Sequence, residues 1–438
     1  MLTIHYFPLD KKTLMRSHCT LDFRMNSPEH AQSWAETING ALGVTGDERR
    51  HVLVLINPFS GTKQAPQLWR TAIKPIFDLA GLTSEAVVTE YQGHARQLAS
   101  QLDLGRYDAV CSVSGDGLFW ELLNGLLARP DWAEAVKLPL APLPGGSGNA
   151  LAFAAGMGDP TTAAFCVARG RARPFDVASV LQERVRCTAF LQLSWGLVAD
   201  VDFESERFRW MGGSRFAVSA VQRIAGLRLY RGRLSYYPVA GWSADAASAA
   251  RCRPTHCPQC ADESYPGRPT GLLTGADAWE AGVVPAGGGG NAFAGLEKSA
   301  LPAGPPTPLL DSLAEGQEEG WVVGADDAYV MVCAANATHI SSDSKMAPLA
   351  HWSDGCWDLV VIKELPKMAL AKMFLALESG EHLDSPHVSY IKVRAFRIDP
   401  DPLPPGTESF LDVDGEKLPE YGPTGVEVHR GLVRLITL

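Results

Sequence analysis

Residues 113–127 read VSGDGLFWELLNGLL, and this stretch decides the fold. It joins the end of an apolar, strand-like run to the start of a helix-like run through Gly115, Asp116 and Gly117. Glycine tolerates backbone angles that other residues avoid, so one interpretation is a tight turn in which Asp116 caps the helix. The alternative is that a bulky, charged ligand approaches the backbone closely at this point.

The segment around this stretch alternates strands and helices. Short apolar runs rich in β-branched residues predict strands at 51–56, 85–90, 107–114 and 138–143. Between them, apolar residues recur at helical spacing, as in APQLWRTAIKPIFDLAG (65–81). This alternation predicts βαβ units and therefore a parallel sheet, in which ligands bind at the carboxyl ends of the strands.

Three of these strands end in a conspicuous loop. The loops are NPFSGT (57–62), SGDG (114–117) and PGGSGN (144–149). Because the carboxyl ends of parallel strands lie at one edge of a sheet, we expect the loops to form a single site. The last loop precedes a helix-like run whose amides could face phosphate oxygens, although it matches neither the Walker A pattern nor the dinucleotide fingerprint. A glycine-rich turn alone is more often structural, but the combination favours phosphate.

Asp116 gains a chemical role if phosphate binds at these loops. Phosphoryl transfer needs a carboxylate that accepts the proton of the attacking hydroxyl or helps to hold Mg²⁺ near the phosphates. The flanking Gly115 and Gly117 leave room for a nucleotide and an acceptor to approach. The set of loops therefore favours a phosphotransferase site over a plain capped turn.

The composition is that of an ordinary globular protein. The chain has 438 residues, 46% of them hydrophobic and 20% charged. Its formal net charge of −10 argues against nucleic acid as a partner, so any anion site must be local. Its nine cysteines are scattered, which predicts reduced thiols rather than a disulfide framework. No apolar run reaches the roughly 18 residues that span a bilayer, and residues 1–12 lack a signal-peptide core, so we expect a soluble, cytoplasmic protein.

The pattern changes after residue 174. Strand-like segments then follow without regular crossover helices, which predicts an antiparallel β domain over 175–438 after an α/β domain over 51–174. The acidic stretch 241–320 is rich in glycine and proline and predicts a disordered insert. Residues 1–50 hold a strand and an amphipathic helix. They form either a plain extension or the remnant of a pleckstrin-homology-like domain, whose closing strand and helix they resemble.

Longer stretches resemble the catalytic domain of diacylglycerol-kinase-type lipid kinases. They include VLVLINPFSGTKQA (52–65), YDAVCSVSGDGLFWELLNGLLARPDW (107–132) and PLPGGSGNALA (142–152). The run LQLSWGLVADVDFESERFRWMGGSRF (191–216) is similar to sphingosine kinases in particular, and FLDVDGE (410–416) continues that similarity.

This resemblance, over about residues 51–240 and 325–438, implies both a fold and an activity. The fold is an α/β nucleotide-binding domain followed by a β-sandwich that encloses the lipid. The activity is ATP- and Mg²⁺-dependent phosphorylation of the primary hydroxyl of sphingosine or a related sphingoid base, by a protein that associates reversibly with membrane surfaces. Ceramide kinase and diacylglycerol kinase are the alternatives within the enzyme class. A non-catalytic lipid-binding adaptor would be expected to lack the Gly-Asp-Gly or Ser-Gly-Asn elements, and both are present.

The resemblance also implies residue roles. Asp116 matches the catalytic aspartate that deprotonates the lipid hydroxyl, and Asp202 matches the aspartate that binds the amino-alcohol head group. Gln192, which stands where the family has a serine, and Glu121 are the other substrate-binding candidates. No residue is assigned as a direct metal ligand. Nucleotide contacts are implied for residues of several loops and for two arginines, namely Asn57, Thr89, Ser114, Gly115, Gly117, Ser147, Gly148, Arg209, Arg215, Asp414, Gly415 and Glu416.

The acidic residues around Asp202 have a structural alternative. Asp200, Asp202, Glu204 and Glu206 alternate, so they would share one face if the segment is extended. That face is either a site for an ammonium group or a solvated acidic edge. The resemblance favours a binding role for Asp202.

Two further features are also open to two interpretations. The helix predicted at 215–233 carries five arginines and apolar residues, and it either binds calmodulin or anionic lipid or packs on its own domain. Cys252, His256, Cys257 and Cys260 are four potential zinc ligands. Their spacing is irregular and they lie in the predicted insert, so they are not assigned as a metal site.

Overall fold

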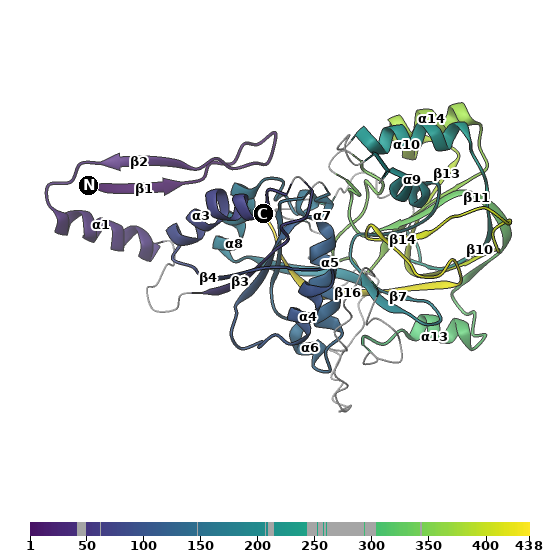
Figure 1. The fold of residues 1–438 in the computed structure, drawn as a ribbon, viewed down its shortest axis with the longest axis horizontal. Helices are drawn as coiled ribbons and strands as arrows, with labels where there is room; N and C mark the ends of the chain where they lie inside the picture. The colour runs from purple at the N-terminus through teal and green to yellow at the C-terminus, as the bar shows by residue number, and fades with distance from the viewer. Residues whose placement is uncertain are drawn as a thin grey trace.

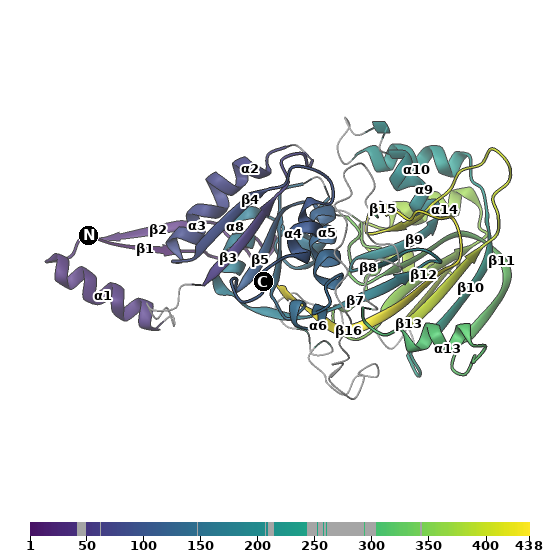
Figure 2. The same ribbon diagram turned by 60° about the horizontal axis from the view of Figure 1, so that its bottom comes forward.

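The structure of the protein is a computed structural model. It consists of an N-terminal hairpin and helix at one end of the molecule, followed along the chain by two halves (Figures 1 and 2). The first half is α/β and the second is built mainly of antiparallel strands, which confirms the predicted fold class. In the described part of the chain, no helix is long and apolar enough to cross a membrane. The described residues are 1–41, 50–61, 63–146, 148–205, 207–208, 214–242, 304–341 and 344–438, with Cys252, Cys257, Cys260 and Phe293.

The α/β half is built on parallel strands in the spatial order β6-β5-β3-β4. Every residue of β5 is buried, as is nearly all of β3, because helices cover the apolar strands on both faces. The strands are β3 (His51–Ile56), β4 (Thr83–Val88), β5 (Ala109–Ser114) and β6 (Leu140–Pro144). The helices are α2 (Ala65–Leu68), a π-helical segment (Trp69–Ile73), α3 (Lys74–Leu79), α4 (His94–Ser100), α5 (Asp116–Leu127), α6 (Trp132–Ala135), α7 (Ala150–Ala154) and α8 (Pro160–Arg169).

The second half consists of antiparallel strands with a few helices at their edges. Its strands are β7 (Ala172–Leu181), β8 (Arg186–Ala189), β9 (Gln192–Gly196), β10 (Tyr230–Pro238), β11 (Val322–Ala335), β12 (Trp357–Lys363), β13 (Val388–Pro400), β14 (Leu411–Val413), β15 (Glu416–Lys417) and β16 (Thr424–Ile436). Its helices are α9 (Leu197–Ser205), α10 (Ser214–Ala225), α13 (Pro308–Ala314), α14 (Lys367–Leu375) and a 3₁₀ segment (Glu381–Asp384).

The strand β16 joins the two halves into one sheet. Its first part pairs with β13, and Leu435 near its end pairs in parallel with Leu140 of β6. Along most of its length β16 also pairs with β7, so the two strands run together between the halves (Figure 2). The predicted domain boundary at residue 174 lies inside β7.

A buried ion-pair network stabilises the loop before β12. Lys392 of β13 is 1% exposed, and its Nζ lies 2.8 Å from Asp354 and 2.9 Å from Asp358, both of which are fully buried. Asp176 of β7 accepts the backbone N–H of Gly355 at 2.7 Å, which ties the same loop to the strand that crosses between the halves. Buried charges are tolerated because each has a partner of opposite charge or a hydrogen bond.

The N-terminal residues extend away from the rest of the molecule (Figure 1). The strands β1 (Leu2–Tyr6) and β2 (Cys19–Phe23) form a hairpin, and α1 (Pro28–Ala41) follows without a buried residue. The loop that connects β1 to β2 contacts α8, where the ring centroids of Phe7 and Phe165 are 5.2 Å apart. Both interpretations of residues 1–50 stay predictions.

The helix α9 corrects the expectation of an extended acidic segment. Gly196 ends β9 in the left-handed region at φ 91°, and the helix begins at the next residue. Residues four apart share a helix face, so Asp200 lies on the same face as Glu204, whereas Asp202 lies on another. Asp200 is fully buried and ion-paired with Arg228, which gives it a structural role.

The helix α10 ends earlier than predicted, at Ala225 instead of residue 233. Burial alternates from Tyr230 to Leu234, the period of a strand, and these residues begin β10. Ala220 and Ile224 of α10 pack with apolar residues of α9 and α14. The described side chains of this helix therefore favour the interpretation that it packs on its own domain.

Residues 304–320 correct part of the predicted disordered insert. They contain α13, whose Leu310 is buried and donates its backbone N–H to the carboxylate of Glu427 at 3.0 Å. Pro308 at the first helical position suits a helix start. Apart from Cys252, Cys257, Cys260 and Phe293, residues 243–303 of the predicted insert lie outside the described residues.

Candidate active site

The three loops that follow β3, β5 and β6 contact one another. The N–H of Gly145 donates to the carbonyl of Ser114 at 2.9 Å, and the N–H of Asp116 donates to the carbonyl of Gly148 at 3.1 Å. Ser60 completes the contact, because its Oγ accepts the N–H of Gly115 at 3.2 Å. The expected convergence at one edge of the sheet is therefore present in the structure.

Asp116 is the first residue of α5 and connects two of these loops. Its carboxylate accepts the backbone N–H of Ala150 at 2.8 Å and that of Leu151 at 3.1 Å, at the start of α7. Burial raises the pKa of the Asp116 carboxyl above its ordinary value, and the two backbone hydrogen bonds act in the opposite direction. The result is a carboxylate held in place by two backbone donors, with a raised pKa that suits a general base.

A loop from the second half reaches the same place. Asp414, at φ 54°, accepts the backbone N–H groups of Phe190, Leu191 and Gln192 at 2.8, 2.9 and 2.8 Å. Burial is the main cause that raises the pKa of Asp414 to about 7, and the charge of Asp116 adds to the increase. The charge of Asp116 therefore acts on the Asp414 carboxyl.

Glu416 in the same loop faces the Gly-Asp-Gly turn. A Cβ atom added to Gly117 would lie 3.6 Å from Oε1 of Glu416, so the glycine leaves space in front of this carboxylate. Gly415 between the two acidic residues is exposed and has φ 85°. The Asp-Gly-Glu and Gly-Asp-Gly segments, far apart in sequence, therefore lie side by side.

A second acidic group lies next to this loop. Asp412 is fully buried. Its carboxylate accepts the hydroxyl of Ser194 at 3.1 Å and the backbone N–H of Gly415 at 2.9 Å. The amide Nε2 of Gln192 lies 3.4 Å from Oδ2 of the same carboxylate. Burial, and then the charge of Asp202, raise the pKa of Asp412 well above its usual range. Of the three predicted substrate-binding residues, Gln192 therefore lies beside Asp412, and the charge of Asp202 acts on the same carboxyl.

Sequence reasoning missed Asp412. The available signal was the alternation in FLDVDGE, where Asp412 and Asp414 would project on the same side of a strand. In the structure Asp412 lies in β14, which pairs with β9, so Leu411, Asp412 and Val413 stand opposite Trp195, Ser194 and Leu193. That pairing could not be derived from either segment alone.

Three other candidates have contacts that support the fold of the site. Asn57 Oδ1 accepts the N–H of Phe59 at 2.9 Å and shapes the first loop, and the hydroxyl of buried Thr89 donates to a backbone carbonyl at 3.3 Å. Glu121 accepts the N–H of Ala95 at 3.2 Å at the start of α4. Burial raises the pKa of Glu121, while hydrogen bonds from this helix start lower it. These contacts give Glu121 a capping role at the start of α4, and its contact with substrate stays a prediction.

The remaining candidates are placed only in part. Ser114, Gly115, Gly117 and Gly148 lie in the loops described above. Ser147 and Arg209 lie outside the described residues, and Arg215 lies in α10, where its side chain is not described.

Comparison with known proteins defines the class of this molecule. Residues 51–180 match the diacylglycerol kinase catalytic domain, and residues 316–437 match the YegS C-terminal NAD kinase beta sandwich-like domain. A solved structure of a diacylglycerol kinase from Bacillus anthracis is similar over 90% of this chain and 98% of that chain, with a TM-score of 0.53 and 14% identity. The family model shows a diacylglycerol-kinase-type catalytic domain, and the solved structure shows that the fold of the whole chain is similar.

Sequence relatives narrow this class. Sphingosine kinase 1 of Arabidopsis thaliana is 34% identical over 403 residues, which cover 90% of this chain and 74% of the relative. Sphingosine kinase 1 of Homo sapiens is 33% identical over 392 residues, which cover 86% of this chain and 88% of the relative. The chain belongs to the sphingosine kinase family, as the resemblance implied, and membership of a kinase family implies ATP as phosphoryl donor.

Proposed function

We propose that this protein transfers the γ-phosphoryl group of ATP to the primary hydroxyl of sphingosine or a related sphingoid base. The observation that carries the proposal is the loop 410–416. Glu416 of this loop faces Gly117 beside Asp116, the charge of Asp116 acts on Asp414, and the charge of Asp202 acts on Asp412. In a sphingoid base the ammonium group and the primary hydroxyl are on adjacent carbons, so a site for one must lie close to the base that acts on the other.

Asp116 acts as the general base in this proposal. It takes the proton of the lipid hydroxyl as the oxygen attacks the γ-phosphorus, and the bond between that phosphorus and the bridging oxygen of ADP breaks. The backbone donors at Ala150 and Leu151 hold the carboxylate in place before the reaction, so little reorganisation is needed.

The residues present fit a magnesium nucleotide. Mg²⁺ prefers carboxylate oxygens and phosphates, and the Asp116, Asp414 and Glu416 carboxylates gather beside the glycine loops. Glu416 faces the space in front of Gly117 and would hold the ion. Bound Mg²⁺ would neutralise charge on the phosphates.

The head-group selectivity rests on Asp202 and Asp412. A buried ammonium group needs an anionic partner, whereas ceramide and diacylglycerol carry no ammonium group. The charge of Asp202 raises the pKa of Asp412, and a cation between the two carboxylates would relieve this repulsion. These acids therefore favour a sphingoid base over the two neutral lipids.

The test is transfer of labelled γ-phosphate from Mg·ATP to sphingosine, ceramide and diacylglycerol, each presented in the same detergent micelles. Label on sphingosine is the expected result. Label only on ceramide or diacylglycerol would support a lipid kinase activity but contradict the proposed selectivity for an ammonium head group. No labelled lipid from a folded, ATP-binding protein would favour the adaptor alternative.

Asp202→Asn is expected to lower kcat/KM for sphingosine by about 10- to 100-fold, the cost of losing one charged hydrogen bond. The matched control is Glu204→Gln in the same helix, since Glu204 is ion-paired with Arg223. We expect this control to change kcat/KM by less than about threefold, because the partly buried pair of Glu204 and Arg223 is not assigned to the head group. An equal loss in both variants, measured with the same lipid micelles, would show a general effect of charge on α9.

Gly146→Ala is expected to raise KM for ATP by roughly ten- to hundredfold, because overpacking typically costs about 1–3 kcal/mol. The added methyl group would lie 2.4 Å from the backbone nitrogen of Gly115 and 2.7 Å from its Cα, so the two loops must separate. Gly422→Ala is the control, because a Cβ there meets nothing within 4 Å. An unchanged KM for ATP in Gly146→Ala would contradict a nucleotide site between these loops.

The proposed partners follow from the substrate. A sphingoid base resides in membranes, so the protein would work as a cytoplasmic enzyme that binds membrane surfaces reversibly.

Calmodulin binding at α10 is less well supported, because Ala220 and Ile224 already pack inside the second half. Val221 remains 67% exposed on the outer side of the helix.

A further inference from the structure

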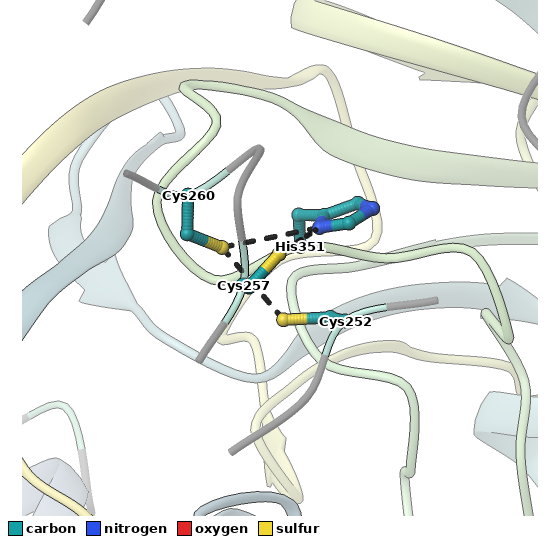
Figure 3. A group of neighbouring side chains, drawn as sticks. All are labelled: Cys252, Cys257, Cys260 and His351. Atoms are coloured by element: carbon teal, nitrogen blue, oxygen red, sulfur yellow. Dashed lines mark hydrogen bonds between the residues drawn. The ribbon is translucent and has the colours of Figure 1, made fainter. Parts of the chain in front are cut away.

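Four potential metal ligands meet outside the catalytic loops. Cys252, Cys257 and Cys260 come from the segment after β10, and His351 comes from the loop between β11 and β12. Their ligand atoms all lie within 4.8 Å of one another. In Figure 3 the thiol groups and the imidazole ring turn towards one another, although His351 is distant in sequence from the three cysteines. His256, the histidine named from the sequence, lies outside the described residues.

The spacing matches a tetrahedral zinc site. Zn–S bonds of about 2.3 Å and Zn–N bonds of about 2.0 Å place two sulfurs about 3.8 Å apart, and a sulfur and a nitrogen about 3.5 Å apart. Sγ of Cys252 and Sγ of Cys260 are 3.7 Å apart. Nδ1 of His351 lies 3.1 Å from Sγ of Cys257 and 3.9 Å from Sγ of Cys260. All these cysteines are free thiols, and the measured sulfur separation is far longer than a disulfide bond of about 2.0 Å.

The surroundings hold the ligands in place. His351 is 3% exposed and Cys257 is 4% exposed. Arg430 of β16 fixes the loop that carries His351, because its Nε donates to the backbone carbonyl of Ser353 at 3.0 Å. Oγ of Ser353 donates to the carbonyl of Cys260 at 3.2 Å, so the two ligand-bearing segments are also joined by a hydrogen bond.

We propose that Cys252, Cys257, Cys260 and His351 bind one structural zinc ion. Thiolate and imidazole ligands in a tetrahedral set select zinc, and four protein ligands leave no open position for a substrate. The sequence spacing agrees, because Cys257 and Cys260 form a Cys-x-x-Cys pair and Cys252 lies within reach of it. The ion ties the segment after β10 to the loop before β12, next to the buried Lys392 network. This site is independent of the proposed phosphoryl transfer.

The first test uses the wild-type chain, purified without chelators and analysed for metals by mass spectrometry. One zinc per chain is the expected result. Cobalt exchanged into the protein should give the absorption of tetrahedral cobalt with thiolate charge-transfer bands. These two measurements decide the proposal even if a ligand variant fails to fold. A wild-type protein without zinc, with or without a disulfide among the three cysteines, would overturn it.

Two ligand variants then locate the ion. Cys257→Ser and His351→Asn are expected to lose most of the bound zinc and the cobalt charge-transfer bands. Cys19→Ser, which removes a half-buried thiol from the N-terminal hairpin, should keep both. Full zinc content in both ligand variants would place the ion elsewhere and reject this site. Because metal content is the measured quantity, the result does not depend on kinase activity.

Discussion

Replacing Asp116 by Asn is expected to lower kcat for sphingosine phosphorylation by about 10²- to 10⁴-fold, the usual contribution of a general base. Asparagine has the same shape, but its amide does not take up the hydroxyl proton. One of the backbone donors at Ala150 and Leu151 can still reach the amide oxygen, so the loops should stay close to their positions. Labelled-phosphate transfer gives kcat, and titration with ATP gives nucleotide binding.

The result is interpretable only if nucleotide binding survives. Asp116→Asn should bind ATP within a few-fold of the wild type, since the proton transfer is the step that it removes. Asp78→Asn is a matched charge-neutralising control, because Asp78 forms an exposed pair with Lys74 on α3. If Asp116→Asn kept a kcat within tenfold of the wild type, the general base would have to be another group.

The largest stability effect is expected for Lys392→Met. Removing this cation leaves the fully buried Asp354 and Asp358 without their charge partner, which typically costs 3–5 kcal/mol, so we expect a loss of about that size in the free energy of unfolding. Denaturant unfolding followed by tryptophan fluorescence measures it. The loss should be smaller in the triple variant that also carries Asp354→Asn and Asp358→Asn, because both partners of Lys392 are then neutral.

An exposed lysine provides the comparison. Lys74→Met removes the partner of Asp78, whose side chain is 55% exposed, and pairs of this kind contribute about 0–1 kcal/mol. Equal losses in Lys392→Met and Lys74→Met would contradict the role assigned to burial in the network.

The α/β half was predictable because its signals are local. The strand β5 is a continuous buried run, Gly115 and Asp116 mark its end, and the helix begins within the same stretch. The rules for parallel sheets then place the loops together without knowledge of any distant residue. For this reason the position of Asp116 follows from the sequence.

The second half was less predictable because its contacts are distant in sequence. Asp412 reaches Ser194 only through the pairing of β14 with β9, and no pattern near either residue encodes that register. The segment after Gly196 looked extended because its acids alternate, but its helix is set by packing against other elements. Likewise His351 joins Cys257 across 94 positions, so the local cysteine spacing gave only part of the ligand set.

The position of β16 has a consequence for how the chain folds during synthesis. Among the described strands β16 is the last to be made, yet it lies between β13 and β6. Until residues 424–436 have left the ribosome, β6 and β13 each present an unpaired edge to the solvent. Exposed edges of this kind favour pairing with other chains, so a nascent chain stalled before β16 would be prone to aggregate.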